Sequence, residues 1–185
     1  MIRKLPGKTN VMTTATKDRF DTSQLSDKEL ALYKALKAVK DPEIPVISVV
    51  DLGIITGVSI DAEDKVVIQM TPTFAGCPAI EVMKSSIAKQ VREEGYEEVT
   101  VEVEFKTNWN SNRITEKGKK QLVEFGLGKP DEHEGEVTME MVEKAECPFC
   151  GSEDTDLQSA FGSALCRSIH YCHSCRQTFE RFKPV

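Results

Sequence analysis

The spacing of hydrophobic positions changes several times along the chain, and each change predicts a new secondary-structure element. The first predicted element is a helix beginning near Leu25, because Ser26 and Glu29 have the spacing of a capping box. This helix is expected to end at Asp41, since a residue that precedes proline avoids the α region. Residues 1–24 are polar, Thr-rich and without periodicity, which predicts a mobile tail.

The segments that follow alternate between extended and helical patterns. Val49–Ile60 and residues 66–70 predict a hairpin, and residues 99–105 alternate apolar with polar positions as a half-buried strand does. Residues 78–95 carry apolar side chains at helical spacing, and residues 115–126 predict a shorter final helix. The expected fold class is α/β, a small α/β sandwich in the order helix, hairpin, helix, strand, helix.

Acidic residues interrupt this pattern at residues 131–146. Their low apolar content predicts a solvated linker, although an acidic docking segment for a basic partner would have the same composition. The chain is thus expected to contain the N-terminal tail, an α/β domain over residues 25–130, this linker, and a C-terminal domain over residues 147–185.

Two Cys-x-x-Cys pairs dominate the C-terminal domain: Cys147 with Cys150, and Cys172 with Cys175. Four thiolates in two tight turns can hold one tetrahedral ion, and this spacing is typical of a zinc ribbon. A segment of about 40 residues rarely buries enough apolar surface to fold alone. We therefore expect a bound metal to hold this β-ribbon together.

A different ion or a different set of ligands would also be consistent with these cysteine pairs. Four thiolates also suit a rubredoxin-like iron or an iron–sulfur cluster. Cys166, His170 and His173 lie near the pairs and could replace a ligand, or they could serve as packing and surface residues. A thiol–disulfide enzyme is a further alternative, but it would need one metal-free pair beside a thioredoxin-like unit.

Composition narrows the classes of function. The net charge of −6 over 185 residues argues against a general nucleic-acid binder, although a nucleic-acid-binding ribbon stays an alternative. No apolar run approaches the roughly 20 residues of a membrane helix, and the first residues do not resemble a secretory signal. Six cysteines without such a signal predict reduced thiols, metal ligation and a cytoplasmic location.

Cys77 is the second candidate for chemistry. It precedes the helix predicted from Pro78, and the free N–H groups and dipole of a helix N-terminus favour a thiolate. The alternative is a small apolar residue that fills the space between loop and helix. Asp41 and Glu43 could direct two carboxylates toward a metal or a partner, or Asp41 could cap the turn that follows it.

Two motifs resemble the SufT-type family of iron–sulfur assembly proteins. They are residues 41–54, with an Asp-Pro-Glu turn before the first strand, and residues 71–78, with a Cys-Pro helix start after the second strand. Trp109 and residues 114–127 resemble the C-terminal part of the same family. Neither a Rossmann nor a P-loop glycine pattern is present.

The cysteine-rich segment is similar to the PaaD family of phenylacetate degradation proteins. The likeness rests on residues 147–152, 159–166 and 171–175, and with the α/β part it covers residues 25–185. The chain departs from the family at Asn112, where an Asp is common, and it lacks a further Cys after Lys183. A Cys that is missing here argues against an obligatory fifth ligand.

The combined resemblance implies an accessory role in aerobic phenylacetate degradation. PaaD-like proteins accompany phenylacetyl-CoA epoxidase, an oxygenase with a di-iron centre and a reductase that carries an iron–sulfur cluster. The implied partners are these oxygenase and reductase subunits, general iron–sulfur assembly proteins, and a second copy of the chain. The chain has no Glu-x-x-His pair of the kind used by di-iron bundles, so we expect a maturation factor rather than a catalyst.

The resemblance also assigns residue roles. Cys77 would be the transient thiolate contact for iron or a cluster, and the four paired cysteines would hold a structural zinc. Four residues of the family motifs would support Cys77: Asp41, Glu43, Asp51 and Thr71. A scaffold that uses no thiol chemistry is the main alternative to this assembly hypothesis.

Overall fold

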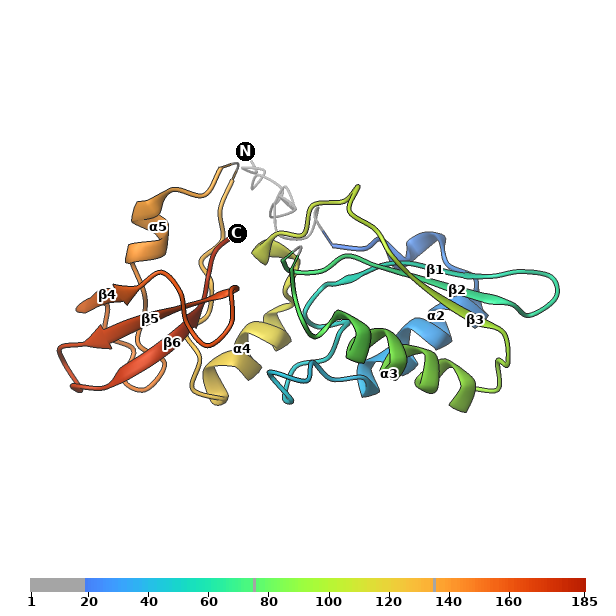
Figure 1. Ribbon diagram of the computed structural model, residues 1–185, viewed down its shortest axis with the longest axis horizontal. Helices are drawn as coiled ribbons and strands as arrows, with labels where there is room; N and C mark the ends of the chain where they lie inside the picture. Colours follow the sequence, from blue (N-terminus) through green and yellow to red (C-terminus); the bar gives the residue numbers. More distant parts are fainter. Residues whose placement is uncertain (1–18, 75, 135) are drawn as a thin grey trace, which may run out of the picture.

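The structure is a computed structural model that describes residues 19–74, 76–134 and 136–185. Its elements follow in the order η1 (Thr22–Gln24), α2 (Asp27–Ala35), η2 (Leu36–Ala38), β1 (Ile55–Ile60), β2 (Val66–Met70), α3 (Ile80–Glu93), β3 (Val99–Val103), η3 (Ser111–Arg113), α4 (Glu116–Glu124), α5 (Met139–Glu143), β4 (Thr155–Ser159), β5 (Arg167–Cys172) and β6 (Thr178–Phe182). Figure 1 shows two lobes with α4 between them. The larger lobe contains β1–β3 with α2 and α3, and the smaller lobe contains β4–β6 with α5.

The larger lobe is built on a three-stranded sheet in the order β1-β2-β3. β1 and β2 form the antiparallel hairpin, whereas β3 runs parallel to β2, and α3 makes the crossover between them. Two neighbouring strands that run in parallel need such a crossover, because the chain must return to the same end of the sheet before the second strand begins. The predicted α/β class, with helix, hairpin, helix and strand in this order, is confirmed.

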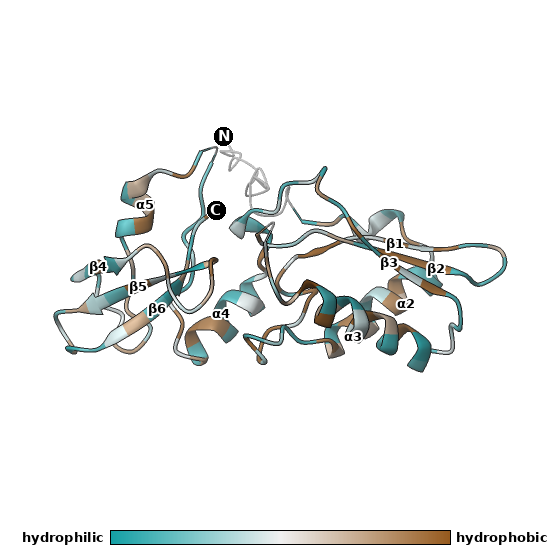
Figure 2. Cartoon of the chain, in the orientation of Figure 1, coloured by the Kyte–Doolittle hydropathy of each residue, from teal (hydrophilic) through white to brown (hydrophobic). Residues whose placement is uncertain are grey.

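Helix α3 covers this sheet with one apolar face. Met83, Ile87 and Val91 lie on that face and are buried, as their helical spacing predicts. Ile68 in the central strand β2 is fully buried in the same apolar cluster. Apolar residues recur along β1–β3, whereas β4 and much of β5 are hydrophilic (Figure 2). The larger lobe therefore holds the main core.

The first helix begins as predicted and ends earlier. The Ser26 N–H donates to the Glu29 carboxylate, and the Ser26 side chain accepts from the Glu29 N–H, which completes the capping box. The prediction that the helix continues to Asp41 is wrong, because α2 ends at Ala35 and a 3-10 turn follows. The chain leaves the helix because Lys40 pairs with Ser48 in an isolated bridge.

The strand predicted from Val49 also begins later than expected. Residues 49–53 form turns, with hydrogen bonds from the Leu52 N–H to Ser48 and from the Gly53 N–H to Val50. Gly53 has a φ of +74°, and a Cβ there would lie 2.4 Å from the carbonyl oxygen of Arg113. Only glycine fits this close approach. The turn therefore includes Gly53, and the extended chain starts after it, at β1.

The smaller lobe is an antiparallel sheet in the order β4-β5-β6. Its own apolar cluster consists of Ala145, Cys147, Cys172 and Phe179, with Cys175 packed against them. A cluster of this size cannot stabilise an independent domain by apolar burial alone.

The two lobes share an interface. Phe182 of β6 is buried in the main core, and its ring centroid lies 5.7 Å from that of Trp109. Gly128 pairs with Arg181 in an isolated parallel bridge, and the Phe182 N–H donates to the Gly128 carbonyl over 2.9 Å. The smaller lobe is therefore attached to the larger one by both packing and backbone hydrogen bonds.

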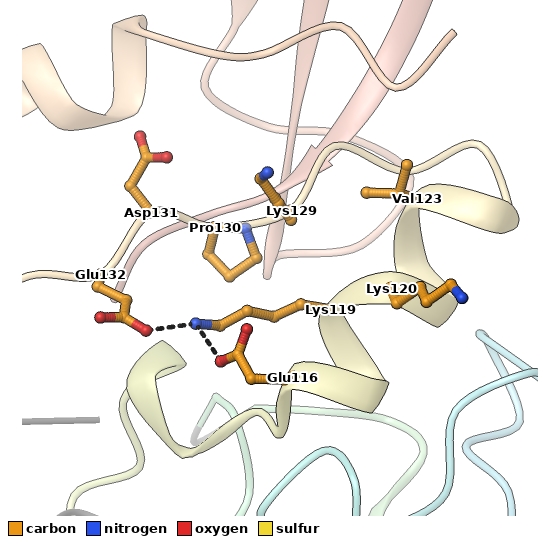
Figure 3. A pocket seen from close by; sticks show the side chains of 8 residues that line it. All are labelled: Glu116, Lys119, Lys120, Val123, Lys129, Pro130, Asp131 and Glu132. Atoms are coloured by element: carbon orange, nitrogen blue, oxygen red, sulfur yellow. Dashed lines mark hydrogen bonds and ion pairs between the residues drawn. The ribbon is translucent and has the colours of Figure 1, made fainter. Parts of the chain in front are cut away.

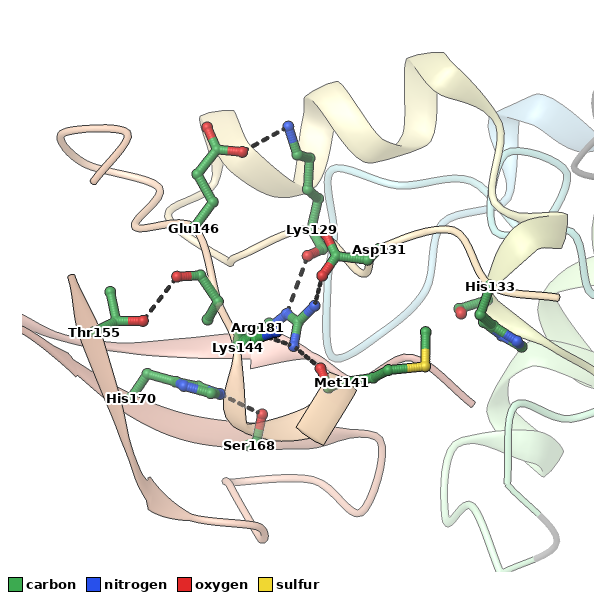
Figure 4. Close-up of polar contacts among 12 residues, drawn as sticks. Lys129, Asp131, His133, Met141, Lys144, Glu146, Thr155, Ser168, His170 and Arg181 are labelled. Atoms are coloured by element: carbon green, nitrogen blue, oxygen red, sulfur yellow. Dashed lines mark hydrogen bonds and ion pairs between the residues drawn. The ribbon is translucent and has the colours of Figure 1, made fainter. Parts of the chain in front are cut away.

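The acidic segment 131–146 packs against both lobes. The buried guanidinium of Arg181 donates to the carbonyls of Met141 and Lys144 and to the carboxylate of Asp131, 2.8 Å away (Figure 4). Val142 in α5 is buried, which a fully solvated linker would not show. The boundaries of the predicted domains remain predictions.

An ion-pair cluster joins the same segment to α4. Lys119 Nζ lies 2.8 Å from Glu132 and 3.1 Å from Glu116, at a cavity between α4 and the start of the acidic segment (Figure 3). Residues 19–24 of the predicted tail also contact the larger lobe, where Arg19 donates to the carbonyl of Ile114. Residues 1–18 lie outside the described residues. Among those that are described, no helix is long and apolar enough to cross a membrane.

Candidate metal centre and thiol site

The four paired cysteines meet at one point of the smaller lobe. Their sulfur atoms all lie within 4.8 Å of one another, and two of the Sγ–Sγ distances are 3.6 Å: Cys147 to Cys175 and Cys150 to Cys172. These distances are too long for disulfides, whose sulfurs are about 2.05 Å apart. Zinc–sulfur bonds of about 2.3 Å give a tetrahedron with edges near ~3.8 Å. The donor set therefore fits a tetrahedral metal ion.

The two turns that present these sulfurs have the same backbone design. The N–H of Gly151 donates to the carbonyl of Cys147 over 2.9 Å, and the N–H of Arg176 donates to that of Cys172 over 2.8 Å. Both donors have positive φ angles, +72° for Gly151 and +60° for Arg176. A positive φ is easy for glycine and costly for arginine, so the second turn accepts strain to place its sulfurs.

The neighbouring candidate ligands have other contacts. His170 is buried, its Nε2 lies 2.9 Å from Ser168 Oγ, and its ring stacks on Phe179. Burial lowers the pKa of His170 to about 4. His173 Nε2 contacts the Asp156 carboxylate over 2.6 Å. Across the described residues, the four paired cysteines are the one group of three or more such ligands.

Cys77 lies in the loop between β2 and α3. Its N–H donates to the carbonyl of Phe74 over 3.1 Å, and this hydrogen bond closes a turn just before the helix. The helix begins at Ile80, two residues later than predicted, so Cys77 precedes the first helical turn. Its side chain is half-buried.

The Cys77 thiol has a raised pKa. Burial is the largest cause, and the carboxylates of Glu43 and Asp41 raise it further. The backbone N–H groups of Ala79 and Ile80 act in the opposite direction but do not outweigh these effects. Desolvation and two nearby anions thus favour the protonated thiol and oppose the influence of the helix N-terminus, and the role of Cys77 stays a prediction.

Two of the predicted supporting residues lie near Cys77. Asp41 is buried and its Oδ1 accepts from the N–H groups of Glu43 and Ile44, both at 2.8 Å. This contact forms the turn that carries Glu43. Glu43 and Cys77 line one cavity of about 230 Å³ between the lobes.

The other two supporting residues brace the fold. Asp51 is buried and accepts from Ser48, Thr115 and Lys117, at 2.7, 3.0 and 3.3 Å. Burial raises the pKa of Asp51, but these hydrogen bonds outweigh it and the pKa is lowered. Thr71 Oγ1 donates to the carbonyl of Thr107 over 2.8 Å. Neither Asp51 nor Thr71 lines the cavity of Cys77.

Sequence reasoning missed one residue of this cavity. Cys166 lines it from the smaller lobe, together with Ser163, Ala164 and Leu165. The sequence suggests Cys166 only as a small packing residue or a ligand of the ribbon. No local pattern links it to Cys77, because 88 residues of chain separate the two and only the docking of the lobes brings them to one cavity.

Comparisons with known proteins match both parts of the chain to known families. Residues 29–103 match the family model described as iron–sulfur cluster assembly protein, and residues 131–183 match the PaaD zinc beta ribbon domain. The chain is 33% identical over 92 residues to an Fe–S protein maturation auxiliary factor of Porphyromonas gingivalis, covering 49% of this chain and 87% of that protein. A crystal structure of domain of unknown function DUF59 from Bacillus anthracis is 33% identical with a TM-score of 0.44, covering 51% of this chain and 90% of that one.

An iron–sulfur assembly domain joined to a cysteine ribbon defines the class of protein. A relative from Escherichia coli (strain K12), named as one of the subunits of a "Putative 1,2-phenylacetyl-CoA epoxidase", is 34% identical over 154 residues. The match covers 83% of this chain and 92% of that protein. The chain belongs to the PaaD family, as its motifs predict.

Proposed function

We propose that the chain is an accessory protein of a phenylacetyl-CoA epoxidase system, and that it assembles or delivers an iron or iron–sulfur centre. The names of the Escherichia coli and Porphyromonas gingivalis relatives support the two parts of this proposal. The observation that carries it is the presence of two separate sulfur sites. Four cysteines form a closed group in the ribbon, while Cys77 lies in a different place, in a cavity between the lobes.

The ribbon group has the structural role. Four thiolates complete the tetrahedral shell of a zinc ion and leave no open position for a substrate. The small apolar cluster beside them, which includes Cys147 and Cys172, needs the ion to stay folded. Zinc therefore keeps the smaller lobe in shape for docking onto the larger one.

Cys77 has the chemical role. Iron, alone or in a cluster, is the cargo, and it binds as the Cys77 thiol releases its proton and forms an iron–sulfur bond. Transfer replaces this bond by one from a ligand of the recipient, and the oxidation state of the iron does not change. When the pKa of a thiol is raised, its proton competes more strongly with the metal for the sulfur. The thiol therefore releases cargo more easily than a ready thiolate would.

The recipients are the oxygenase and reductase subunits of the epoxidase. The carboxylates of Asp41 and Glu43 stabilise cationic cargo near Cys77, while Asp51 and Thr71 keep the surrounding turns in place. Six cysteines in this chain are expected to be reduced and to serve as metal ligands, and we place the protein in the cytoplasm.

Co-production with the epoxidase tests this function. The oxygenase and reductase subunits are produced with the wild-type chain, with the Cys77→Ser variant, with a Val82→Ala control at an exposed position of α3, or alone. Iron and acid-labile sulfide are then measured in each purified partner. We expect Cys77→Ser to match the sample without the chain, and the control to match the wild type.

The same experiment separates assembly from scaffolding. Full iron and sulfide in the partners produced with Cys77→Ser would remove the thiol from the mechanism and leave an adaptor that acts by binding alone. A deficit confined to oxygenase iron would identify the di-iron centre as the one served, and a deficit confined to reductase sulfide would identify the cluster. Unchanged zinc content of Cys77→Ser verifies that the ribbon is intact.

A further inference from the structure

The cavity that contains Cys77 has walls from both lobes and a second thiol. Glu43, Phe74, Cys77 and Pro78 line it from the larger lobe, and residues 163–166 line it from the smaller lobe, ending with Cys166. Cys166 does not belong to the four-cysteine group of the ribbon. It packs against the core of the larger lobe, as Cys77 does.

The wall that carries Cys166 is held by an ion pair between buried Arg167 and partly exposed Glu180. Arg167 Nη1 lies 3.0 Å from Glu180 Oε2, and the Glu180 carboxylate accepts from both the N–H and the hydroxyl of Ser163. A Cβ at Gly162 would lie 2.7 Å from the Glu180 carboxylate and 3.3 Å from the backbone of Arg167, so the glycine packs closely against this ion pair. The loop before Cys166 therefore has a defined shape rather than a free surface conformation.

The same arginine ties this wall to the other lobe. Arg167 Nη2 donates to the backbone carbonyl of Glu43 over 3.1 Å. Glu43 lies in the turn formed by Asp41, so the guanidinium of Arg167, the residue after Cys166, is tied to that turn. Hydrogen bonds thus connect the wall that carries Cys166 to the Glu43 turn of the other wall, across the interface.

Both thiols respond to the same surroundings. Burial raises the pKa of Cys166 to about 11, and the carboxylates of Glu43 and Asp41 raise it as they raise that of Cys77. Arg167 is the positive group beside Cys166 and acts in the opposite direction. The two thiols are affected by the same carboxylates and line the same cavity, so they lie in one electrostatic environment.

We propose that Cys77 and Cys166, which line one cavity, bind the iron or iron–sulfur cargo together, so that the site is complete only when the lobes are docked. This inference rests on the proposed function and extends it from one thiol to two. Each thiol releases one proton as its iron–sulfur bond forms, and no electron is transferred. Two soft sulfur ligands select iron or a cluster over the hard cations of the cell.

Phe74 and Leu165 make the walls beside the thiols apolar. They are 45% and 44% exposed, and both line the cavity. Apolar walls limit the access of water and therefore slow the hydrolysis of a bound cluster, while the exposed faces leave an opening for transfer to a recipient.

A binding titration tests the two-thiol site. The full chain with its ribbon filled with zinc is titrated without oxygen with ferrous iron, and thiolate-to-iron absorption is followed. Wild type is compared with Cys77→Ser, Cys166→Ser, the double variant and the Val82→Ala control. Since even outer-shell partners of a metal contribute about 10- to 100-fold in affinity, each single variant should bind at least about tenfold more weakly. The double variant should lose little more than either single variant.

The outcomes separate this inference from the proposed function. Wild-type binding by Cys166→Ser together with loss in Cys77→Ser would overturn the two-thiol site and leave the role of Cys77 intact. Wild-type binding by both single variants would overturn both proposals. Zinc content and melting temperature of each variant show whether the lobes remain folded.

A second measurement needs no substitution. Dibromobimane bridges two thiols that share one cavity, and the bridged peptides are identified by mass spectrometry. We expect a product that joins the Cys77 peptide to the Cys166 peptide, and we expect prior loading with ferrous iron to suppress it. Absence of this product in zinc-filled wild-type protein would contradict the shared site.

Discussion

The two lobes are stabilised in different ways. The larger lobe buries an extensive apolar cluster that includes Leu36, Ile54 and Ile68, each almost free of solvent exposure. The smaller lobe has a cluster of four buried residues, two of which are the metal-site cysteines Cys147 and Cys172. The comparison indicates that the larger lobe depends on apolar burial, whereas the smaller lobe depends on an ion and on its attachment to the larger one.

Removal of the metal should produce the largest difference in stability between the two lobes. Cys147→Ser, or chelation of the metal, should unfold the smaller lobe, since structural zinc contributes about 10 kcal/mol or more to the folding of small zinc domains. Amide hydrogen exchange should show protection lost in β4–β6 and kept in β1–β3. Cys77→Ser serves as the control, because it removes a thiol outside the metal group.

The result for Cys147→Ser also tests the ligand set. Its metal content should fall to near zero. Tight metal that persists in this variant would mean that Cys166 or a histidine replaces the lost sulfur, and it would contradict the four-cysteine site.

A core truncation should affect the larger lobe instead. Ile68→Ala in β2 removes three carbon atoms from a fully buried position, and it should lower the free energy of unfolding by about 4 kcal/mol. Urea unfolding measures this change, and Val82→Ala, 53% exposed on α3, should stay within about 0.5 kcal/mol of wild type. Zinc content should remain unchanged in the folded Ile68→Ala protein; a loss of zinc would show that the lobes do not differ as described.

A smaller effect is expected at the attachment between the lobes. Arg181→Gln leaves the partly buried carbonyls of Met141 and Lys144 without their donor, and it should cost about 3 kcal/mol, because each unsatisfied buried polar group costs about 1–3 kcal/mol. Hydrogen exchange in residues 136–146 should increase. Arg92→Gln, at an exposed position of α3, should change neither stability nor exchange. Unchanged exchange in Arg181→Gln would mean that other contacts hold the acidic segment.

The smallest effect concerns acid stability. The hydrogen bonds of Asp51 lower its pKa in the folded chain, so its carboxylate stabilises the fold at neutral pH, and this contribution is lost as the pH falls through the lowered pKa. Asp51→Asn should cost about 2 kcal/mol at neutral pH. The difference from wild type should shrink in acid, below the ordinary carboxyl pKa of 3.8.

Denaturant unfolding between pH 7 and pH 3 measures this convergence. Glu102→Gln, at an exposed position of β3, is the matched control and should show no such trend. A difference between wild type and Asp51→Asn that stays constant with pH would show that Asp51 contributes through packing rather than through its charge.

Local patterns predicted the elements that local chemistry determines. Ser26 and Glu29 predicted a helix start because a capping box needs only neighbouring residues, and Met83, Ile87 and Val91 predicted the buried face of α3 from spacing alone. The two Cys-x-x-Cys pairs predicted a metal group whose sulfurs the structure brings within 4.8 Å.

Long-range contacts account for what the sequence could not show. The turn at residues 49–53 depends on the approach of Arg113 to Gly53, which no local pattern contains. The raised pKa of Cys77 depends on burial and on the Asp41 and Glu43 carboxylates, whereas its neighbours in sequence suggested the opposite direction.

The central claim is that the chain has two sulfur sites with different roles, and metal analysis of protein purified without oxygen tests it most directly. Zinc, iron and acid-labile sulfide are measured together with the absorption spectrum, for wild type and for Cys77→Ser. We predict one zinc per chain, retained in Cys77→Ser, and no visible absorption until iron and sulfide are supplied. Iron with sulfide-to-iron absorption that persists in Cys77→Ser would place a cluster in the ribbon and contradict the account.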